Sequence, residues 1–223
     1  MERALIIGAS GGIGAAVATA LRSRGVATCA LSRSRDGFDL TDEAAVASGL
    51  AQAAAQGPYD LVLVASGALE IDGQSPEKTL RAVRAPTMLA QFALNAVGPA
   101  LVLGAAHRLL PRQRHAVLAV LSARVGSIGD NRLGGWVSYR AAKAALNQIV
   151  HTAAIELARS HPQAICAALH PGTVATGLSR RYLGRHPAVP PETAAANLLH
   201  VIDRLRPADS GGFFDGAGQP VPW

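Results

Sequence analysis

The stretch GASGGIG, residues 8–14, determines how the rest of the sequence is interpreted. It continues a short apolar run at 3–8 and leads into an alanine-rich stretch, 13–24, whose apolar residues have helical spacing. The glycines allow a tight turn and a close approach to a pyrophosphate, and the helix adds unpaired N–H groups and its positive dipole end. Because the spacing is G-x-x-x-G-x-G rather than the commoner G-x-G-x-x-G, the stretch alone also suits a packing turn. Its place between a strand and a helix favours a dinucleotide-binding loop. The cofactor-binding residues expected in it are Gly8, Ser10, Gly11, Gly12, Ile13 and Gly14.

Outward from this loop, strand-like and helix-like segments alternate along the chain. Helical patterns are expected at 43–56, from Pro86 and from Pro99, at 137–160 and at 192–205, and strands at 3–8, 27–31, 38–40, 60–65, 116–121, 164–169 and 212–215. Continuous apolar strands between helices are typical of strands buried on both faces. We therefore expect an α/β Rossmann fold with a doubly wound, mostly parallel sheet of about seven strands and helices on both faces. Ligands of such sheets bind at the carboxyl ends of the strands.

Composition narrows the class of protein. With 49% hydrophobic and 16% charged residues, the chain has enough apolar surface for a folded core, which argues against disorder. The 223 residues show no linker or internal repeat, so one domain over 1–223 is expected. Cys29 and Cys166 are too few for a disulfide framework and lie in apolar runs, which suits a reducing cytoplasm.

Neither a nucleic acid nor a membrane is an expected partner. The net charge is +6, but the basic residues are scattered and do not alternate with aromatic residues that could stack on bases. No uninterrupted apolar run approaches the roughly 20 residues that span a bilayer. The nearest, 96–106, is interrupted by Gly98-Pro99 and Gly104. We therefore expect a cytoplasmic protein. The histidines lack metal-ligand spacing, so no metal site is expected.

The end of the second strand bears on the choice of dinucleotide. An acidic residue there would hold the ribose 2′-hydroxyl of NAD(H), whereas arginine would accept the 2′-phosphate of NADP(H). Arg33 is the first charged residue after that strand, which favours NADP(H) over NAD(H). The alternative is a solvated arginine, with Asp36 supplying the carboxylate for NAD(H). Asp39 and Leu40 are expected against the adenine, unless Asp39 only begins a turn.

Tyr139 and Lys143 form a Y-x-x-x-K pattern within the long helix at 137–160. Residues four apart share one helix face. A free tyrosine has a pKa of about 10, and a nearby cation lowers that value by stabilising the phenolate. Tyr139 could then protonate an oxygen that gains charge as hydride arrives, while Lys143 also binds the nicotinamide ribose. The alternative is an ordinary surface pair.

The sequence resembles the short-chain dehydrogenase/reductase family over nearly its whole length. The features in family order are the loop at 8–14, Asp39-Leu40, Asn95, Tyr139 with Lys143, Pro171-Gly172 ending at Thr176, and residues 212–216. Residues 122–129 and Tyr139-Arg140 are more closely similar to the branch of small carbonyl reductases related to C-factor and sniffer proteins.

The resemblance implies a role for each of these positions. Tyr139 would be the general acid/base, tuned by Lys143, and Asn95 would hold a water that links Lys143 to solvent. Without the family, Asn95 is more simply a residue that satisfies the local helix backbone. The loop that would wrap the nicotinamide contributes Pro171, Gly172, Val174 and Thr176.

Two positions depart from the family pattern. Where the family has Asn-Asn-Ala-Gly after a strand, this chain has Val64-Ala65-Ser66-Gly67, in which Ser66 and Gly67 would still approach the cofactor. Where the family has Ser-Ser, of which the second orients the substrate carbonyl, this chain has Ser122-Ala123. We expect Ser122 to take that role. Ser127 is the second choice, and the absence of a catalytic serine is the third.

The sequence therefore predicts an NADP(H)-dependent oxidoreductase that acts on a small carbonyl or secondary alcohol. The alternative is an NADP(H)-binding sensor or scaffold with weak or no turnover. Residues 177–186 would form part of a substrate lid or a solvated basic face, and Trp136 would line the pocket or pack internally. The family implies a homodimer or homotetramer.

Overall fold

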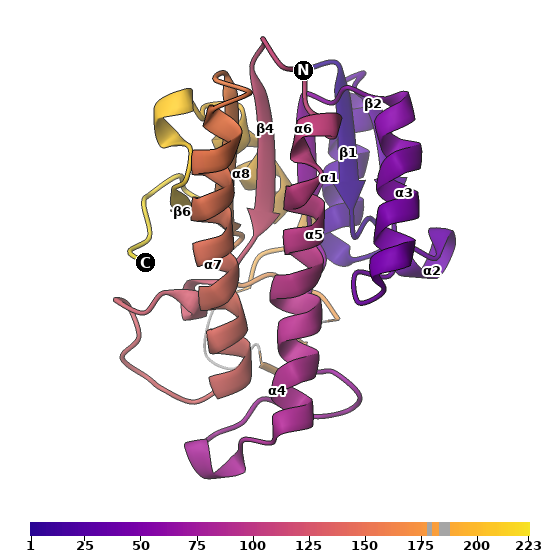
Figure 1. Ribbon diagram of the computed structural model, residues 1–223. Coiled ribbons are helices and arrows are strands. Elements are labelled where there is room, and N and C mark those ends of the chain that lie inside the picture. Colours follow the sequence, from indigo (N-terminus) through magenta and orange to yellow (C-terminus); the bar gives the residue numbers. More distant parts are fainter. Residues whose placement is uncertain (178–179, 183–187) are drawn as a thin grey trace.

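The structure is a computed structural model that describes residues 1–177, 180–182 and 188–223. Its centre is a sheet of six parallel strands in the order β2-β1-β3-β4-β5-β6 (Figure 1). The strands are β1 Arg3–Ile7, β2 Ala27–Leu31, β3 Leu61–Val64, β4 Ala116–Leu121, β5 Ala164–His170 and β6 Phe213–Asp215. The chain leaves β1 toward β2 on one side and later enters β3 on the other. The strand order therefore reverses between β1 and β3, where such sheets bind ligands.

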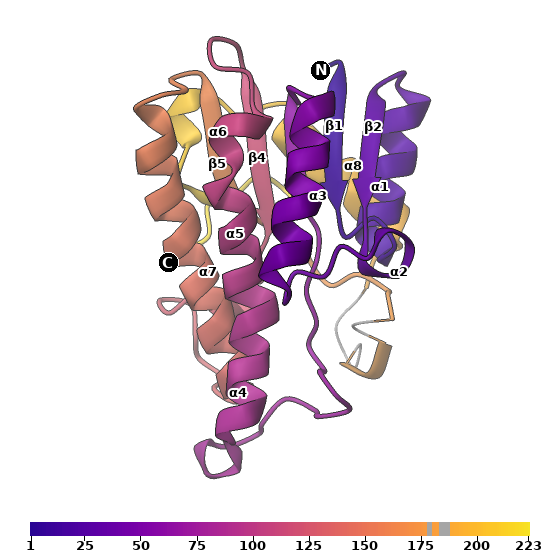
Figure 2. The same cartoon turned by 45° about the vertical axis from the view of Figure 1, so that its right-hand side comes forward.

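Helices cover both faces of the sheet, as the alternating pattern predicts (Figures 1 and 2). The helices of one face are α3 Glu43–Gln56, α5 Gly98–Gly104, α6 Ala106–Leu109 and α7 Val137–Ala158, and those of the other are α1 Gly12–Ser23 and α8 Pro191–Ile202. Along β4 and β5, even-numbered residues pack toward α7 and odd-numbered residues toward α1 and α8. Both faces are apolar, which is why these strands are continuous apolar runs.

The described sheet has six strands, so the expected number of about seven is wrong. The expected strand at 38–40 does not form, and a four-residue helix, α2 Arg33–Asp36, precedes it. Phe38 and Leu40 are apolar because they fill space beneath helices rather than join the sheet. A Cβ on Gly49 of α3 would lie 2.4 Å from the Phe38 ring, and one on Gly98 of α5 would lie 2.6 Å from Leu40 Cβ.

One long helix crosses the expected interruption at Gly98-Pro99. It comprises α4 Ala85–Phe92, a π-helical segment at Ala93–Val97, and α5. The π turn directly precedes Pro99, which has no N–H to donate within a helix. The stretch Ala85–Gly104 is long and apolar enough to cross a membrane by length and composition alone. Because its inner side packs against α3 and α7, we interpret it as a core helix.

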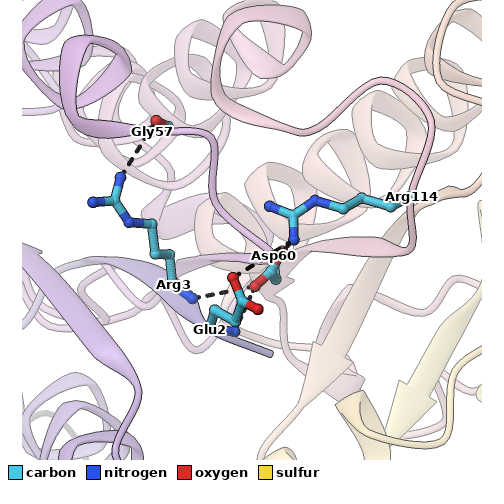
Figure 3. A network of polar contacts seen from close by, with 5 residues as sticks. All are labelled: Glu2, Arg3, Gly57, Asp60 and Arg114. Carbon is cyan, nitrogen blue, oxygen red and sulfur yellow. Dashed lines mark hydrogen bonds and ion pairs between the residues drawn. The ribbon is translucent and has the colours of Figure 1, made fainter.

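A polar network lies at the amino-terminal ends of the strands, away from the carboxyl ends where such sheets bind ligands (Figure 3). The buried Asp60 carboxylate accepts hydrogen bonds from the backbone N–H groups of Glu2 (2.5 Å) and Arg3 (3.1 Å), and forms an ion pair with Arg114 (3.3 Å). Arg3 also donates to the carbonyl of Gly57. The network joins the starts of β1, β3 and β4, so we interpret its charges as structural.

Candidate active site

The glycine-rich stretch forms the turn between β1 and α1. Gly8 has a φ of 86°, and a Cβ there would lie 2.6 Å from Ser66 Oγ in the loop after β3. A Cβ on Gly14 would lie only 2.3 Å from the carbonyl oxygen of Gly8. The turn therefore requires glycine at both positions and lies beside the strand-order reversal.

The start of α1 carries donors that the described protein leaves unpaired. Gly11 precedes the helix and provides no side-chain cap. The backbone N–H groups of Gly12, Ile13 and Gly14 make no hydrogen bond with any residue in 1–177, 180–182 or 188–223. Ile13 also lines a cavity of about 840 Å³, so these donors lie at its edge. Such an arrangement suits an anionic group such as a pyrophosphate.

Tyr139 and Lys143 lie one turn apart on α7 and line the same cavity. They are 9% and 3% exposed, so the pair does not lie on the surface. The Lys143 Nζ atom lies 5.8 Å from the centre of the Tyr139 ring and donates a hydrogen bond to the carbonyl of Leu121 (3.0 Å). This bond ties α7 to the carboxyl end of β4.

Burial acts on both titratable groups. It raises the pKa of the Tyr139 phenol above its ordinary value and lowers the pKa of Lys143 to about 8. The structure therefore does not show the expected lowering of the tyrosine pKa by lysine; desolvation, which the Y-x-x-x-K pattern does not reveal, raises this pKa instead. A phenol with a raised pKa remains protonated at neutral pH and can serve as a proton donor.

Asn95 lies in the π-helical segment and is fully buried. Its side chain accepts from the N–H of Ala68 (3.2 Å) and donates to the carbonyl of Ala68 (3.0 Å) and to Gln91 Oε1 (2.7 Å). A Cβ on Gly67 would lie 2.9 Å from Asn95 Oδ1 and 3.5 Å from Lys143 Nζ. Asn95 and Lys143 therefore approach each other across Gly67.

The sequence reasoning missed Gln91. Its side chain is buried, and it donates to the carbonyl of Leu69 (2.9 Å) as well as accepting from Asn95. Together these two amides support residues 67–69, the loop that lacks the family's paired asparagines. The available signal was the spacing of four between Gln91 and Asn95, which places both on one helix face.

The three candidate positions for the substrate-orienting serine have different surroundings. Ser122 is buried at the cavity wall and donates from Oγ to Asn147 Oδ1 on α7 (2.6 Å). Ala123 is partly exposed and lines the cavity. Ser127 accepts from the N–H of Asp130 (3.0 Å) and is not among the cavity-lining residues. Ser122 is therefore the hydroxyl of this group that reaches the cavity.

The end of β2 bears the residues considered for the choice of dinucleotide. Asp36 accepts from both the N–H and the hydroxyl of Ser32 (2.8 and 3.1 Å). Arg33 is exposed and forms no ion pair with any described carboxylate. Asp39 accepts from the N–H and hydroxyl of Thr41, and these bonds lower the pKa of Asp39, so this residue does begin a turn. Leu40 is buried beneath α5.

The loop after β5 completes the cavity beside the glycine turn. Its lining residues include Pro171, Gly172, Val174 and Thr176. Gly172 has a φ of 80°, and a Cβ there would meet nothing within 4 Å. A Cβ on Gly12 would lie 2.8 Å from Thr176 Cγ2, so this loop packs directly against the start of α1. Residues 178–179 and 183–187, which include most of the expected lid or basic face, lie outside the described residues.

Comparison with known proteins agrees with this architecture. A family model described as short chain dehydrogenase matches residues 37–184. The chain belongs to the short-chain dehydrogenase family.

Two curated relatives show how far the likeness of this short-chain dehydrogenase extends. It is 31% identical to 1-hydroxy-2-glutathionyl-2-methyl-3-butene dehydrogenase of Rhodococcus sp. (strain AD45) over 238 aligned positions that cover all of both chains. It is 37% identical to C-signal of Myxococcus xanthus over 140 positions, which cover 61% of this chain and 78% of that protein. The first match extends beyond the region of the family model to the whole chain.

Solved structures share the fold. The carbonyl reductase Sniffer of Drosophila melanogaster superposes with a TM-score of 0.85 at 21% identity over all of both chains. An NADP-bound short-chain dehydrogenase/reductase from Burkholderia multivorans has a TM-score of 0.81 at 23% identity over 100% of this chain and 99% of that one. At these identities the likeness establishes the fold of the dehydrogenase.

A buried acidic residue that the sequence reasoning missed fixes the start of α7. Glu77 accepts from the backbone N–H of Ser138 (3.2 Å) and from its hydroxyl, while its own carbonyl accepts from the N–H of Trp136 (2.5 Å). Burial opposes ionisation of Glu77, but the hydrogen bonds from Ser138 and from the backbone of Glu77 itself together outweigh it and lower the pKa of the carboxyl. Both bonded residues lie just before Tyr139, so Glu77 positions the first turn that carries the phenol.

Trp136 lines the cavity and also packs internally, so both expected roles apply. Its φ is 51°, a left-handed conformation that is rare for a bulky residue. Its ring meets Tyr139 edge-on at 6.4 Å and Tyr182 edge-on at 5.4 Å, measured between ring centres. Trp136 therefore connects α7 to residues 180–182.

Proposed function

We propose that this short-chain dehydrogenase transfers hydride between the nicotinamide of NADP(H) and a small carbonyl or secondary alcohol. The observation that carries the proposal is the buried pair of Tyr139 and Lys143 in the cavity that the unpaired N–H groups of α1 border. The bound nicotinamide would supply or accept the hydride. The protein would bind and orient the cofactor and the substrate, and it would move the proton.

Each residue then has a defined task in carbonyl reduction. The Tyr139 hydroxyl donates its proton to the substrate oxygen, and the charge of Lys143 stabilises the phenolate that remains. Lys143 also binds ribose hydroxyls, and Asn95 places a water through which the proton of Tyr139 is restored from solvent. The glycine turn holds the pyrophosphate, and the loop at 171–176 holds the nicotinamide side.

Arg33 supports NADP(H) over NAD(H). Its guanidinium is exposed and not ion-paired among the described residues, whereas the competing Asp36 carboxylate is bonded to Ser32. A charged fork of this kind suits a 2′-phosphate. Asp39 and Leu40 then support the adenine side from the turn after α2.

We expect Arg33→Asp to weaken NADPH binding at least about tenfold more than NADH binding, because it replaces a charge-assisted bond with repulsion. Fluorescence titration of the two reduced cofactors measures the ratio. Arg35→Asp, two residues further along α2, is the matched control. Equal losses for both cofactors would exclude a 2′-phosphate role for Arg33.

Ser122 remains the proposed substrate-orienting residue, and Asn147 explains how its proton becomes available. As placed, the Ser122 hydroxyl donates to Asn147 Oδ1, and the buried Asn147 Nδ2 has no partner among the described residues. A half-turn of the amide makes Nδ2 the donor to Ser122 Oγ. That change pairs the orphan group and frees the hydroxyl proton for a carbonyl oxygen.

We expect Ser122→Ala to lower kcat at least about tenfold, since loss of an oxyanion donor costs about 10²–10³ in other enzymes. Steady-state reduction of an aldehyde measures the change. Ser127→Ala is the control, because its hydroxyl caps a turn away from the cavity. A Ser122→Ala variant with wild-type kcat moves the role elsewhere.

The lowered pKa of Lys143 sets a pH dependence. Burial brings the pKa of Lys143 to about 8, so its charge is present below that pH and is lost above it. We expect kcat/KM for carbonyl reduction to be level below pH 8 and then to fall about tenfold per unit. Lys143→Arg keeps the cation at high pH and should remove the fall. A fall that persists in this variant contradicts the assignment to Lys143.

Ala123 in place of the family's serine favours a second candidate, an NADP(H)-binding sensor or scaffold with slow turnover. Oxidation of NADPH in the presence of aldehydes, ketones and quinones distinguishes the two. Turnover supports the oxidoreductase, and tight NADPH binding without turnover supports the sensor. A homodimer or homotetramer in the cytoplasm is our proposal for its state in the cell.

A further inference from the structure

The wall of the cavity formed by residues 124–140 carries an excess of positive charge. Its charged lining residues are Arg124, Asp130, Arg132 and Arg140. Arg124 is neutralised, because it forms ion pairs with Asp130 (3.5 Å) and Asp215 (3.4 Å). Arg132 and Arg140 form no ion pair with any carboxylate in the described part of the chain.

Arg140 is the better ordered of these two cations. Its Nε donates to the carbonyls of Gly134 (3.2 Å) and Gly135 (2.9 Å), and its Nη1 donates to the carbonyl of Val125 (3.1 Å). These bonds fix the guanidinium between two loops. Its Nη2 donates to no residue in 1–177, 180–182 or 188–223.

The surroundings of Arg140 leave its charge poorly compensated. The residue is half-buried, and desolvation lowers the pKa of its guanidinium, which nevertheless stays charged. Backbone carbonyls provide only partial negative charge, so an anion would gain more here than at a fully solvated arginine.

Arg132 adds a second cation to the same wall. It is exposed, and its only described bond is a long one to the carbonyl of Asn131 (3.5 Å). Arg132 lies two residues before Gly134, and Arg140 donates a hydrogen bond to the Gly134 carbonyl. This bond links the two cations through the same loop. Two further acids are not among the cavity-lining residues: Glu70 forms an ion pair with Arg181, and the Glu77 carboxylate accepts hydrogen bonds from Ser138.

Apolar side chains line the same cavity as these cations and the Tyr139 phenol. Among the cavity-lining residues are Leu69, Val125, Leu133 and Trp136. The cavity therefore combines an apolar interior with a cationic wall, a pattern that suits a ligand with an apolar body and one anionic end.

We propose that Arg140 and Arg132 form a subsite for a carboxylate of the substrate, so that the natural substrate is an amphipathic carbonyl or alcohol whose acid group lies several bonds from the reacting carbon. The proposal rests on the function proposed above, because it names the substrate class of the same site.

Matched pairs of aldehydes test it. The pairs are 4-carboxybenzaldehyde with its methyl ester, and the longer 4′-formylbiphenyl-4-carboxylate with its methyl ester, each reduced with NADPH. We expect kcat/KM for the acid to exceed that for the ester about tenfold or more in at least one pair, through a lower KM. Raising the salt concentration should reduce the preference.

Two variants assign the preference to the subsite. Arg132→Gln and Arg140→Gln should each bring the acid-to-ester ratio toward one. General damage to the loop at 134–135 would slow the reduction of acid and ester alike. The acid-to-ester ratio is therefore unaffected by such damage, and the rate with the ester alone measures it. Arg112→Gln, an exposed arginine outside the cavity, is the control and should keep the wild-type ratio.

The outcomes separate the two proposals. Equal reduction of acid and ester, or a preference that survives loss of both arginines, overturns the carboxylate subsite and leaves the oxidoreductase intact. NADPH binding without reduction of any of the four aldehydes, or of the ketones and quinones tested above, overturns the proposed function, and the subsite falls with it.

Discussion

Tyr139→Phe is expected to lower kcat for carbonyl reduction about 10³-fold while NADPH affinity changes less than about twofold, because general acid catalysis typically contributes 10²–10⁴. The substitution removes one hydroxyl and keeps the ring. The ring's edge-on contact with Trp136 at 6.4 Å and its place near Lys143 Nζ are therefore retained. Single-turnover oxidation of bound NADPH measures the chemical step, and fluorescence titration measures the affinity.

Tyr182→Phe provides the matched control for this prediction. Tyr182 also lines the cavity, but its hydroxyl donates to Glu70 (2.5 Å), and its pKa is raised by burial and by this bond to the carboxylate. We expect this variant to affect KM more than kcat, since the hydroxyl of this cavity-lining residue ties residues 180–182 to Glu70 rather than donating a proton to the substrate. If Tyr139→Phe retains more than a tenth of the wild-type kcat, another group donates the proton.

The burial of Tyr139 bears on its proposed role as a proton donor. In an exposed pair, lysine would mainly lower the tyrosine pKa and produce a base. In this structure desolvation raises the pKa of Tyr139 and lowers that of Lys143. Transfer of the proton to substrate would create a phenolate beside a cation in a buried site, where the attraction is strongest. Under the proposed mechanism, Tyr139 would therefore keep its proton until an acceptor oxygen is present.

The sequence predicted the parts of the fold that depend on local pattern. The doubly wound sheet, the helices on both faces and the turn between β1 and α1 all follow from apolar runs separated by helical spacing. The strand at 38–40 was wrong because apolar residues also fill gaps beneath helices. Phe38 lies against Gly49, and Leu40 against Gly98, contacts between segments that periodicity within 38–40 cannot reveal.

The supporting residues of the site depended on contacts that are distant in the sequence. Glu77 reaches Ser138 across 61 residues, and Ser122 reaches Asn147 across 25. Neither pair has a spacing that a motif describes. The Y-x-x-x-K spacing predicted a shared face for Tyr139 and Lys143 because that relation lies within one helix. Their burial depends on other elements that pack around them, so the Y-x-x-x-K spacing could not predict it.

The second large effect is expected at Gly14, where the glycine turn leaves no space for a side chain. A Cβ on Gly14 would lie 2.3 Å from the carbonyl oxygen of Gly8 and 2.9 Å from its carbonyl carbon. Both contacts are with backbone, which cannot rotate away as a side chain can. The start of α1 would have to move away from β1, and the N–H groups of Gly12, Ile13 and Gly14 would move with it.

We therefore expect Gly14→Ala to lower kcat/KM for NADPH about 10²-fold, since a misplacement of about 1 Å can cost that much. Gly11→Ala tests the same turn with little crowding, because its Cβ would meet only the Gly8 carbonyl oxygen at 3.4 Å, and we expect a smaller loss. Gly104→Ala, where a Cβ meets nothing within 4 Å, controls for substitution in a helix. Thermal unfolding of each variant separates a displaced turn from a protein that no longer folds. If Gly14→Ala folds and binds NADPH as the wild type does, the pyrophosphate does not lie on the first turn of α1, and the cofactor must enter the cavity by another side.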